Sequence, residues 1–273
     1  MPKIKVNGVE LYYEDTGGIG KEIIVFSHGL LLNCRMFDAQ IAALSSRFRC
    51  ITYDHRGQGQ SEITSSGYDM ETVYEDAAHL IRALDAVPCH FVGVSMGGFV
   101  GIRLAARQPK LLKSLTLIET SADREPEQNV PRYRLFNQLF KWVGPIWIVN
   151  PTMNILFGQK FLTDPARVKQ REDLKRQLTG LSRVGTPRAV SGVINRHSVY
   201  EELGNIKLPT LIMVGDEDIA TMPEKSKRIA SKIPNSKMAV IPGAGHSSTL
   251  EEPEMVNKLL ELFLNNQNNS SFS

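Results

Sequence analysis

Short apolar runs alternate with amphipathic stretches along most of this chain, and this alternation constrains the fold more than any other feature. The apolar runs are rich in β-branched residues, which indicates buried strands. The six expected strands are Ile23–Ser27, Cys50–Asp54, Phe91–Ser95, Ser114–Glu119, Thr210–Gly215 and Met238–Gly243. Apolar residues recur at helical spacing in Phe37–Leu44, Met70–Ala86, Gly97–Gln108, Glu224–Ile233 and Glu254–Leu264. This repetition predicts an α/β fold with a mostly parallel sheet covered by helices on both faces.

Three further segments complete the expected organisation. At the N-terminus, the Asn7-Gly8 turn between two alternating runs predicts a β-hairpin. Between about residues 121 and 200 there is no strand-like alternation, so we expect several helices inserted into the α/β domain. We therefore divide the chain into an α/β core at 1–120 and 201–264, a helical insertion at 121–200 and a polar tail at 265–273.

Charge and cysteine content exclude several classes of function. The net charge is only +3 and no run of Lys or Arg occurs, so we expect no nucleic-acid partner. No stretch of about 18 apolar residues is present, and we expect no membrane partner. The start of the chain lacks the apolar core of a signal peptide, and the three cysteines are widely spaced. Together these features suit a reducing cytoplasm and argue against a disulfide framework or a metal site.

The sharpest chemical signal is the sequence Gly93-Val94-Ser95-Met96-Gly97, which follows an expected strand and opens an expected helix. Such a strand-to-helix turn holds a serine hydroxyl above the sheet in a strained backbone. Glycine on either side removes the β-carbons that would clash in so sharp a turn. We predict that Ser95 is a nucleophile; the alternative is a glycine-rich structural turn.

A serine hydroxyl needs a base to remove its proton as it attacks, and His246 is the expected base. It lies in the loop after the last expected strand, at the sheet edge where ligands of open α/β sheets collect. The chain order of serine, acid and histidine also selects it. The histidines at other positions fit structural roles better: His55, His79, His90 and His197.

An acidic residue should hold the imidazole in its correct tautomer. Asp218 is our choice, because it lies beyond the end of the strand that begins at Thr210 and could face His246. Asp216 and Glu217 are alternatives that fit capping or solvent-exposed roles better. Glu119, at the end of an earlier strand, is a more distant rival.

Acyl transfer develops an oxyanion, which preorganised backbone N–H groups stabilise. The N–H groups of Leu30 and Met96 are the expected pair, one after an early strand and the other directly after the serine. Gly29 would let the backbone approach closely, and His28 would brace the loop rather than act as a second base.

Taken together, these motifs resemble the α/β-hydrolase superfamily over about residues 1–264. The resemblance rests on His28-Gly29, residues 53–61, residues 93–98, Gly215–Asp218 and Gly243–His246, in the family's order. It implies an eight-stranded sheet with a helical cap at 121–200, and the same triad of Ser95, His246 and Asp218. No metal or organic cofactor is implied. Val94 and Gln58 depart from residues that many relatives carry there, and these departures leave the subgroup open.

The resemblance implies acyl transfer to water, with a small ester or lactone as substrate. The motifs look most like those of carboxylesterases, 3-oxoadipate enol-lactonases and carbon–carbon bond hydrolases, and we rank a carboxylesterase first. A ligand-binding receptor is the alternative from a different class. The sequence leaves a homo-oligomer open.

The insertion offers candidates for substrate binding. Trp142 and Trp147 are the expected substrate-binding residues, and other apolar side chains there could line the same pocket: Ile146, Ile148, Met153 and Phe157. Packing within the cap is the competing interpretation of all six. Residues 121–200 hold thirteen Lys or Arg and six Asp or Glu, so the insertion is basic while the rest of the chain is acidic. That excess could attract an anionic substrate, although solvated helix faces explain the same residues.

Overall fold

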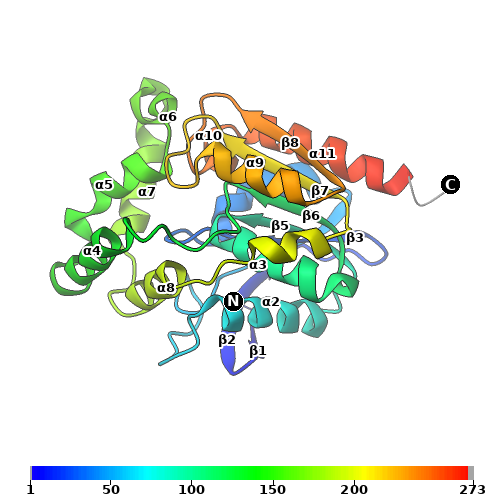
Figure 1. Cartoon of the computed structure of the whole chain (residues 1–273), viewed down its shortest axis with the longest axis horizontal. Coiled ribbons are helices and arrows are strands. Elements are labelled where there is room, and N and C mark those ends of the chain that lie inside the picture. Colours follow the sequence, from blue (N-terminus) through cyan, green and yellow to red (C-terminus); the bar gives the residue numbers. More distant parts are fainter. Residues whose placement is uncertain (1, 270–273) are drawn as a thin grey trace.

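The computed structural model describes residues 2–269, and an eight-stranded sheet forms the centre of this part of the chain (Figure 1). In chain order the strands are β1 (Lys3–Val6), β2 (Val9–Asp15), β3 (Glu22–Ser27), β4 (Phe48–Tyr53), β5 (Cys89–Val94), β6 (Leu112–Ile118), β7 (Thr210–Gly215) and β8 (Ser236–Ile241). Their order across the sheet is β1-β2-β4-β3-β5-β6-β7-β8. The β1–β2 and β2–β4 pairs are antiparallel and the other pairs are parallel. The predicted mostly parallel α/β sheet is therefore confirmed.

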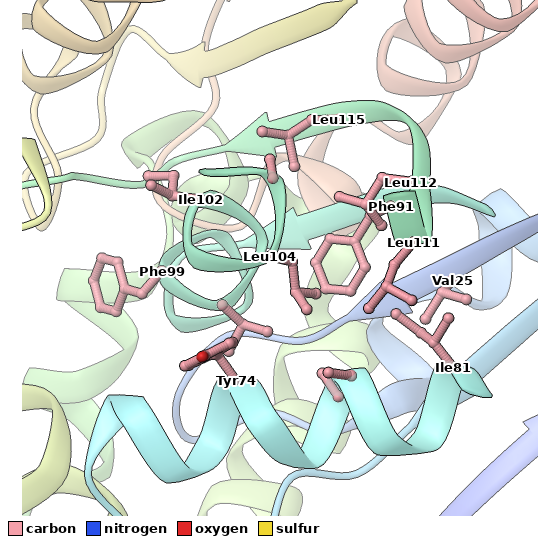
Figure 2. Packing of buried hydrophobic residues seen from close by; sticks show 14 of the residues in the cluster. Val25, Tyr74, Ile81, Phe91, Phe99, Ile102, Leu104, Leu111, Leu112 and Leu115 are labelled. Atoms are coloured by element: carbon pink, nitrogen blue, oxygen red, sulfur yellow. The ribbon is translucent and has the colours of Figure 1, made fainter. Parts of the chain in front are cut away.

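Helices cover both faces of the sheet, as the sequence pattern predicts. One face packs against α2 (Met70–Ala83), α3 (Met96–Arg107) and α9 (Pro223–Lys232). Figure 2 shows the core on this side, where Tyr74 and Ile81 of α2 lie near Phe91 and Leu104. The opposite face packs against α1 (Asp38–Leu44) and α11 (Pro253–Asn269). Burial of two apolar faces against helices explains why the central strands read as nearly continuous apolar runs.

Five helices between β6 and β7 lie together at one end of the molecule, far from the C-terminal end of α11 (Figure 1). They are α4 (Val130–Val143), α5 (Val149–Leu156), α6 (Gln159–Thr163), α7 (Val168–Thr179) and α8 (Gly185–Ile194). Part of this group has an apolar core of its own, which includes Met153, Phe157 and Phe161. We refer to these helices as the cap helices. Five short 3-10 turns connect elements along the described chain: η1 (Cys34–Phe37), η2 (Pro109–Leu111), η3 (Pro145–Trp147), η4 (Pro165–Arg167) and η5 (Tyr200–Asn205).

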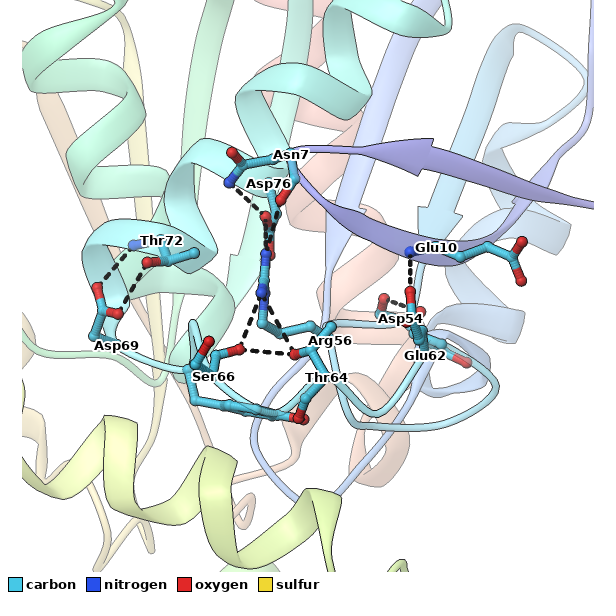
Figure 3. A network of polar contacts seen from close by, with 12 residues as sticks. Asn7, Glu10, Asp54, Arg56, Glu62, Thr64, Ser66, Asp69, Thr72 and Asp76 are labelled. Carbon is cyan, nitrogen blue, oxygen red and sulfur yellow. Dashed lines mark hydrogen bonds and ion pairs between the residues drawn. The ribbon is translucent and has the colours of Figure 1, made fainter.

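A buried ion pair anchors the loop after β4. The guanidinium of Arg56 donates from Nε and Nη2 to the two carboxylate oxygens of Asp76, each at 2.6 Å (Figure 3). Asn7 Nδ2 donates to the same carboxylate at 2.8 Å. This bidentate geometry fixes the guanidinium in one orientation, and the contacts connect the loop to α2 and to the β1–β2 turn. The loop that continues to Gln58 is thereby held in place.

The C-terminal segment differs from the sequence prediction. Helix α11 continues to Asn269, five residues past the end at Leu264 that the apolar pattern indicated. The last residues of α11 are polar, so helical spacing of apolar side chains could not mark the end of the helix. The rest of the expected polar tail, residues 270–273, lies outside the described residues.

Candidate active site

Ser95 lies in the tight turn between β5 and α3, with φ = 51° and ψ = −108°. A left-handed φ is unfavourable for a residue with a β-carbon, so the surrounding contacts must hold this conformation. Two glycines allow those contacts: a Cβ at position 97 would lie 2.0 Å from the carbonyl oxygen of Ser27, and one at position 93 would lie 2.3 Å from that of Gly97. The local sequence thus permits a backbone crossing that other residues would block.

The side chain of His246 lies between those of Ser95 and Asp218. Its Nε2 is 2.8 Å from Ser95 Oγ, and its Nδ1 is 3.0 and 2.9 Å from the two carboxylate oxygens of Asp218. A carboxylate can only accept, so Nδ1 carries the proton and Nε2 presents its lone pair to the serine hydroxyl. All three side chains are more than 90% buried. The loops after β5, β7 and β8 bring them together at the carboxyl edge of the sheet.

The carboxylate of Asp218 has other hydrogen-bond donors besides the histidine. Backbone N–H groups of Ala220 and Thr221 donate to Oδ1 at 2.8 and 2.9 Å, and Thr221 Oγ1 donates to Oδ2 at 2.8 Å. Burial on its own would raise the pKa of Asp218, but His246 and these donors outweigh it and hold the pKa below its usual value. Asp218 is therefore ionised and fixed in orientation at neutral pH.

The other candidate carboxylates have different partners. Glu119 is fully buried and accepts the backbone N–H of Ser248 at 3.2 Å. Asp216 accepts the N–H of Gly243 at 2.7 Å, and Glu217 accepts that of Gln159. These three carboxylates bind backbone N–H groups of loops. Of the four candidate acids, Asp218 is the one whose carboxylate contacts the imidazole of His246.

His28 and His55 are buried, and their hydrogen bonds join the loops that follow β3 and β4. The backbone N–H of His55 donates to Nε2 of His28 at 3.0 Å, and Nδ1 of His28 lies 2.7 Å from the carbonyl oxygen of Gly29. The first bond makes Nε2 an acceptor, so His28 is neutral with its proton on Nδ1. Burial lowers the pKa of both rings, which agrees with neutral imidazoles that brace loops.

Leu30 and Met96 are the two residues expected to supply N–H groups for an oxyanion. Leu30 lines the same cavity as Ser95, and Met96 follows Ser95 directly in the chain. Met96 is the first residue of α3, where backbone N–H groups have no acceptor within the helix. The neighbouring loop comes close, since a Cβ at Gly29 would lie 3.4 Å from Ser95 Cβ. Gln58 connects the two segments: its Oε1 accepts from Leu31 N at 3.2 Å, and its Nε2 lies 3.8 Å from Met96 Sδ.

A cavity of about 200 Å³ opens beside Ser95 and His246. The α/β core contributes Leu30, Leu31 and Phe99, while the cap helices contribute most of the other side chains. Those from α4 and α5 are Tyr133, Phe136, Asn137, Phe140, Pro151, Thr152, Ile155 and Leu156. The walls are mainly apolar, and the reactive serine and histidine lie at one side.

The two tryptophans do not line this cavity, which corrects the sequence-based expectation for Trp142 and Trp147. Each is 74% exposed, and Ile146 is 67% exposed. Of the other residues proposed for the pocket, Ile148 lines it, whereas Met153 and Phe157 are buried in the core of the cap helices. Apolar residues on two sides of α4 and η3 gave the sequence no way to indicate which side faces inward.

Two residues that support the site were not predicted from the sequence. Thr221 lies three positions after Asp218 and supports it, which an Asx turn after the strand could have suggested. Glu251 is fully buried, and its carboxylate accepts the N–H groups of Gly245 and Ser247 at 3.0 and 3.1 Å, on either side of His246. Its other oxygen accepts the N–H of Gly158 at 2.7 Å. One carboxylate therefore ties the histidine loop to the cap helices.

Among residues 2–269, no group of three or more His, Cys, Asp or Glu side chains could hold a metal ion. The chemistry available at the site is that of a buried serine, imidazole and carboxylate beside helix N–H groups.

Comparison with known proteins agrees with this architecture. The family model described as the alpha/beta hydrolase fold matches residues 22–253. The AB hydrolase superfamily protein YisY of Bacillus subtilis is 31% identical over 267 residues, covering 94% of this chain and 96% of YisY. The 3-oxoadipate enol-lactonase 1 of Acinetobacter baylyi is 29% identical, covering 94% and 92%. A thermophilic esterase from Thermogutta terrifontis superposes with a TM-score of 0.90 and 28% identity, covering 98% and 99%.

Proposed function

This chain belongs to the α/β-hydrolase family, and we propose that it is a serine hydrolase that cleaves small carboxylic esters or lactones. The family match and the hydrolase-named relatives support a hydrolase enzyme. The finer assignment rests on one observation, the imidazole of His246 between Ser95 Oγ and the Asp218 carboxylate. In this proposal residues 1–120 and 201–264 form the catalytic core, and residues 121–200 form a cap over it.

In the first step of the proposed mechanism, Nε2 of His246 takes the proton of Ser95 as Oγ attacks the carbonyl carbon. Asp218 stabilises the imidazolium that results, and its bonds to Ala220 and Thr221 keep it in position. The carbonyl oxygen becomes an oxyanion, which the N–H groups of Leu30 and Met96 stabilise. Each such donor contributes on the order of 3 kcal/mol to the transition state.

In the second half, the imidazolium protonates the leaving alcohol oxygen, and the acyl group stays on Ser95. His246 then removes a proton from water as the water oxygen attacks the acyl carbon. The bond to Ser95 Oγ breaks, the imidazolium returns the proton to Oγ, and the acid is released. With a lactone, the leaving oxygen stays attached to the acyl group, so ring opening gives one product.

The size of the cavity supports a small substrate. The cavity volume of about 200 Å³ is below the roughly 300–1,000 Å³ of pockets that hold drug-sized ligands. The largely apolar walls favour an aliphatic or aromatic acyl group over a polar one. An esterase and an enol-lactonase among the similar proteins agree with this substrate class.

A substrate panel tests the proposal directly. Purified protein is assayed with 4-nitrophenyl acetate, butyrate and octanoate, with a set of five- and six-membered lactones, and with a vinylogous diketone. We expect hydrolysis of short esters or lactones, and none in Ser95→Ala. Turnover by Ser95→Ala at the wild-type rate would refute the assignment, and hydrolysis of the diketone alone would move the activity to carbon–carbon bond cleavage.

A further inference from the structure

Six large apolar side chains stand exposed on neighbouring turns of α4 and η3. They are Leu135, Leu139, Trp142, Val143, Ile146 and Trp147, and we call them the cap patch. Their exposed fractions run from 43% for Leu139 to 74% for each tryptophan. Exposed apolar side chains that gather on one surface mark a site of interaction, unlike those that occur singly.

Helix α4 is apolar on two sides. Tyr133, Phe136 and Phe140 line the cavity beside the serine. Leu135, Leu139 and Trp142 lie on the other side and face solvent. The inner side already supplies the contacts that hold α4 on the protein. Packing within the fold therefore does not explain why the outer side is also apolar.

The surroundings of the cap patch are positively charged. No Asp or Glu occurs between residues 128 and 163 or between 174 and 200. Arg132 and Lys141 are exposed on α4, and the exposed Arg183 donates to the carbonyl oxygen of Lys141 at 3.2 Å. Helix α7, which packs beside η3, carries four Lys or Arg and two acidic residues. The acids nearest to α4 along the chain, Glu125 and Glu127, are paired with Arg196 and Arg124.

We propose that the cap patch docks onto an anionic lipid surface. Apolar side chains enter the boundary between headgroups and acyl chains, and the Lys and Arg residues around them attract the headgroups. Tryptophan is favourable at that boundary because its ring is amphipathic. Both tryptophans of the chain are in the patch.

A second copy of the chain fits this surface less well. A two-fold contact places the same patch on both partners, so the cations would face cations with few acids to pair with. A contact between the basic cap of one copy and the acidic core of another joins two different surfaces. Repeating such a head-to-tail contact gives a closed ring at particular rotation angles and otherwise an open filament. An anionic bilayer carries the opposite charge and has no such constraint.

Docking of this kind does not need a spanning segment. Within residues 2–269 no helix is long and apolar enough to cross a membrane. The sequence-based expectation of no membrane partner rested on the same absence, which concerns spanning and leaves adsorption to a surface open.

Intrinsic fluorescence gives a direct test, because the signal from tryptophan comes only from the cap patch. Full-length protein is titrated with phosphatidylcholine vesicles and with vesicles containing about one third phosphatidylglycerol. We expect a blue shift with the anionic vesicles, quenching by brominated acyl chains, and co-flotation of the protein. Raising the salt from about 0.05 M to about 0.5 M should weaken binding, since the headgroup attraction is screened.

A matched pair of double variants locates the surface. Leu135→Gln with Leu139→Gln makes the patch more polar but keeps both tryptophans as reporters, and we expect a partition coefficient lower by about tenfold or more. Met255→Gln with Leu262→Gln changes two exposed apolar residues of α11 and should bind like the wild type. Ser95→Ala should also bind normally, so the result is independent of the proposed hydrolase activity.

Three results would overturn the proposal. The first is the lack of any blue shift or flotation with anionic vesicles, and the second is equal binding by the cap-patch variant and the wild type. The third is a dimer that forms without lipid as the protein concentration rises, and whose formation shifts the tryptophan emission. That outcome would assign the patch to an interface between copies of this chain.

Discussion

Nε2 of His246 lies 2.8 Å from Oγ of Ser95, although 151 positions separate the two residues in the chain. The serine follows β5 in the middle of the sheet, and the histidine follows the edge strand β8. Their contact therefore depends on the lengths of the loops that leave the carboxyl edge. Glu251, bonded on both sides of the histidine, fixes one of these loops.

Removing the triad residues should abolish ester hydrolysis without unfolding the protein. We expect Ser95→Ala to lower kcat by on the order of 10⁴–10⁶, since the nucleophile is lost. Asp218→Asn should cost on the order of 10⁴, because an amide cannot hold the same imidazole tautomer. Steady-state kinetics with a short aryl ester measure both. Circular dichroism melts serve as the control for folding.

Replacing Glu119 by Gln should separate its role from that of Asp218. Burial raises the pKa of Glu119 well above its usual value, and the negative charge of Asp218 raises it further. A raised pKa in the folded state means that the folded protein favours protonated Glu119, so its contribution to stability is present below about pH 4 and is lost as the pH rises through the folded-state pKa. Glu119→Gln is neutral at every pH, so the unfolding free energy should fall less steeply with rising pH than in the wild type.

Urea unfolding at several pH values checks this expectation, and the difference between the two proteins isolates the titration of residue 119. Hydrolysis should survive in Glu119→Gln. If activity disappears in this variant but is retained in Asp218→Asn, the acid of the triad is Glu119 instead.

Glu251→Gln should reduce kcat more than it changes KM. Glutamine presents one oxygen and one NH₂ group, so at least one of the three N–H groups now bound by the carboxylate must face another donor. A lost bond to a charged group costs about 1.5–3 kcal/mol of stability, and a looser loop misplaces His246. We expect kcat to fall about tenfold or more, since small displacements of a catalytic group are costly.

Kinetics and chemical unfolding of Glu251→Gln are compared with those of Glu254→Gln, an exposed neighbour that should behave like the wild type. A variant with wild-type kcat but lower stability would limit Glu251 to a structural role.

Gly97→Ala should destabilise the fold strongly. Its new methyl group would lie 2.0 Å from a backbone carbonyl oxygen, which cannot move without shifting β3. We expect a loss of about 3 kcal/mol or more, or failure to fold. Gly204→Ala is the matched control, because a Cβ at that position meets no atom within 4 Å. Thermal unfolding of the two variants side by side measures the difference.

Phe136→Ala should enlarge the cavity and shift the preference toward longer acyl chains. Phe136 lines the cavity, whereas Trp142 on the same helix faces solvent. Burial of each added methylene contributes about 0.8 kcal/mol when space is available, a factor of roughly four in kcat/KM. A chain-length series of 4-nitrophenyl esters measures the shift. Trp142→Ala should leave the series unchanged; a similar shift there would return the tryptophan to the substrate pocket.

The α/β sheet, the turn at Ser95 and the order of the chemical motifs could be predicted from the amino-acid sequence. These features are local: a buried strand needs a continuous apolar run, and the turn needs glycine where neighbouring backbone approaches within about 2 Å of a Cβ position. Asp218 and His246 could be proposed because the carboxyl ends of parallel strands meet at one edge of a sheet.

The folded chain was needed to identify which apolar residues face the cavity and which carboxylates hold the loops in place. Helix α4 is apolar on two sides, so its periodicity is compatible with either side facing inward. The prediction that Trp142 lines the pocket is wrong for that reason. Glu251 binds backbone N–H groups from two loops that lie far apart in the chain. Backbone groups look alike in every sequence, and only the folded chain brings particular ones within reach of a buried carboxylate.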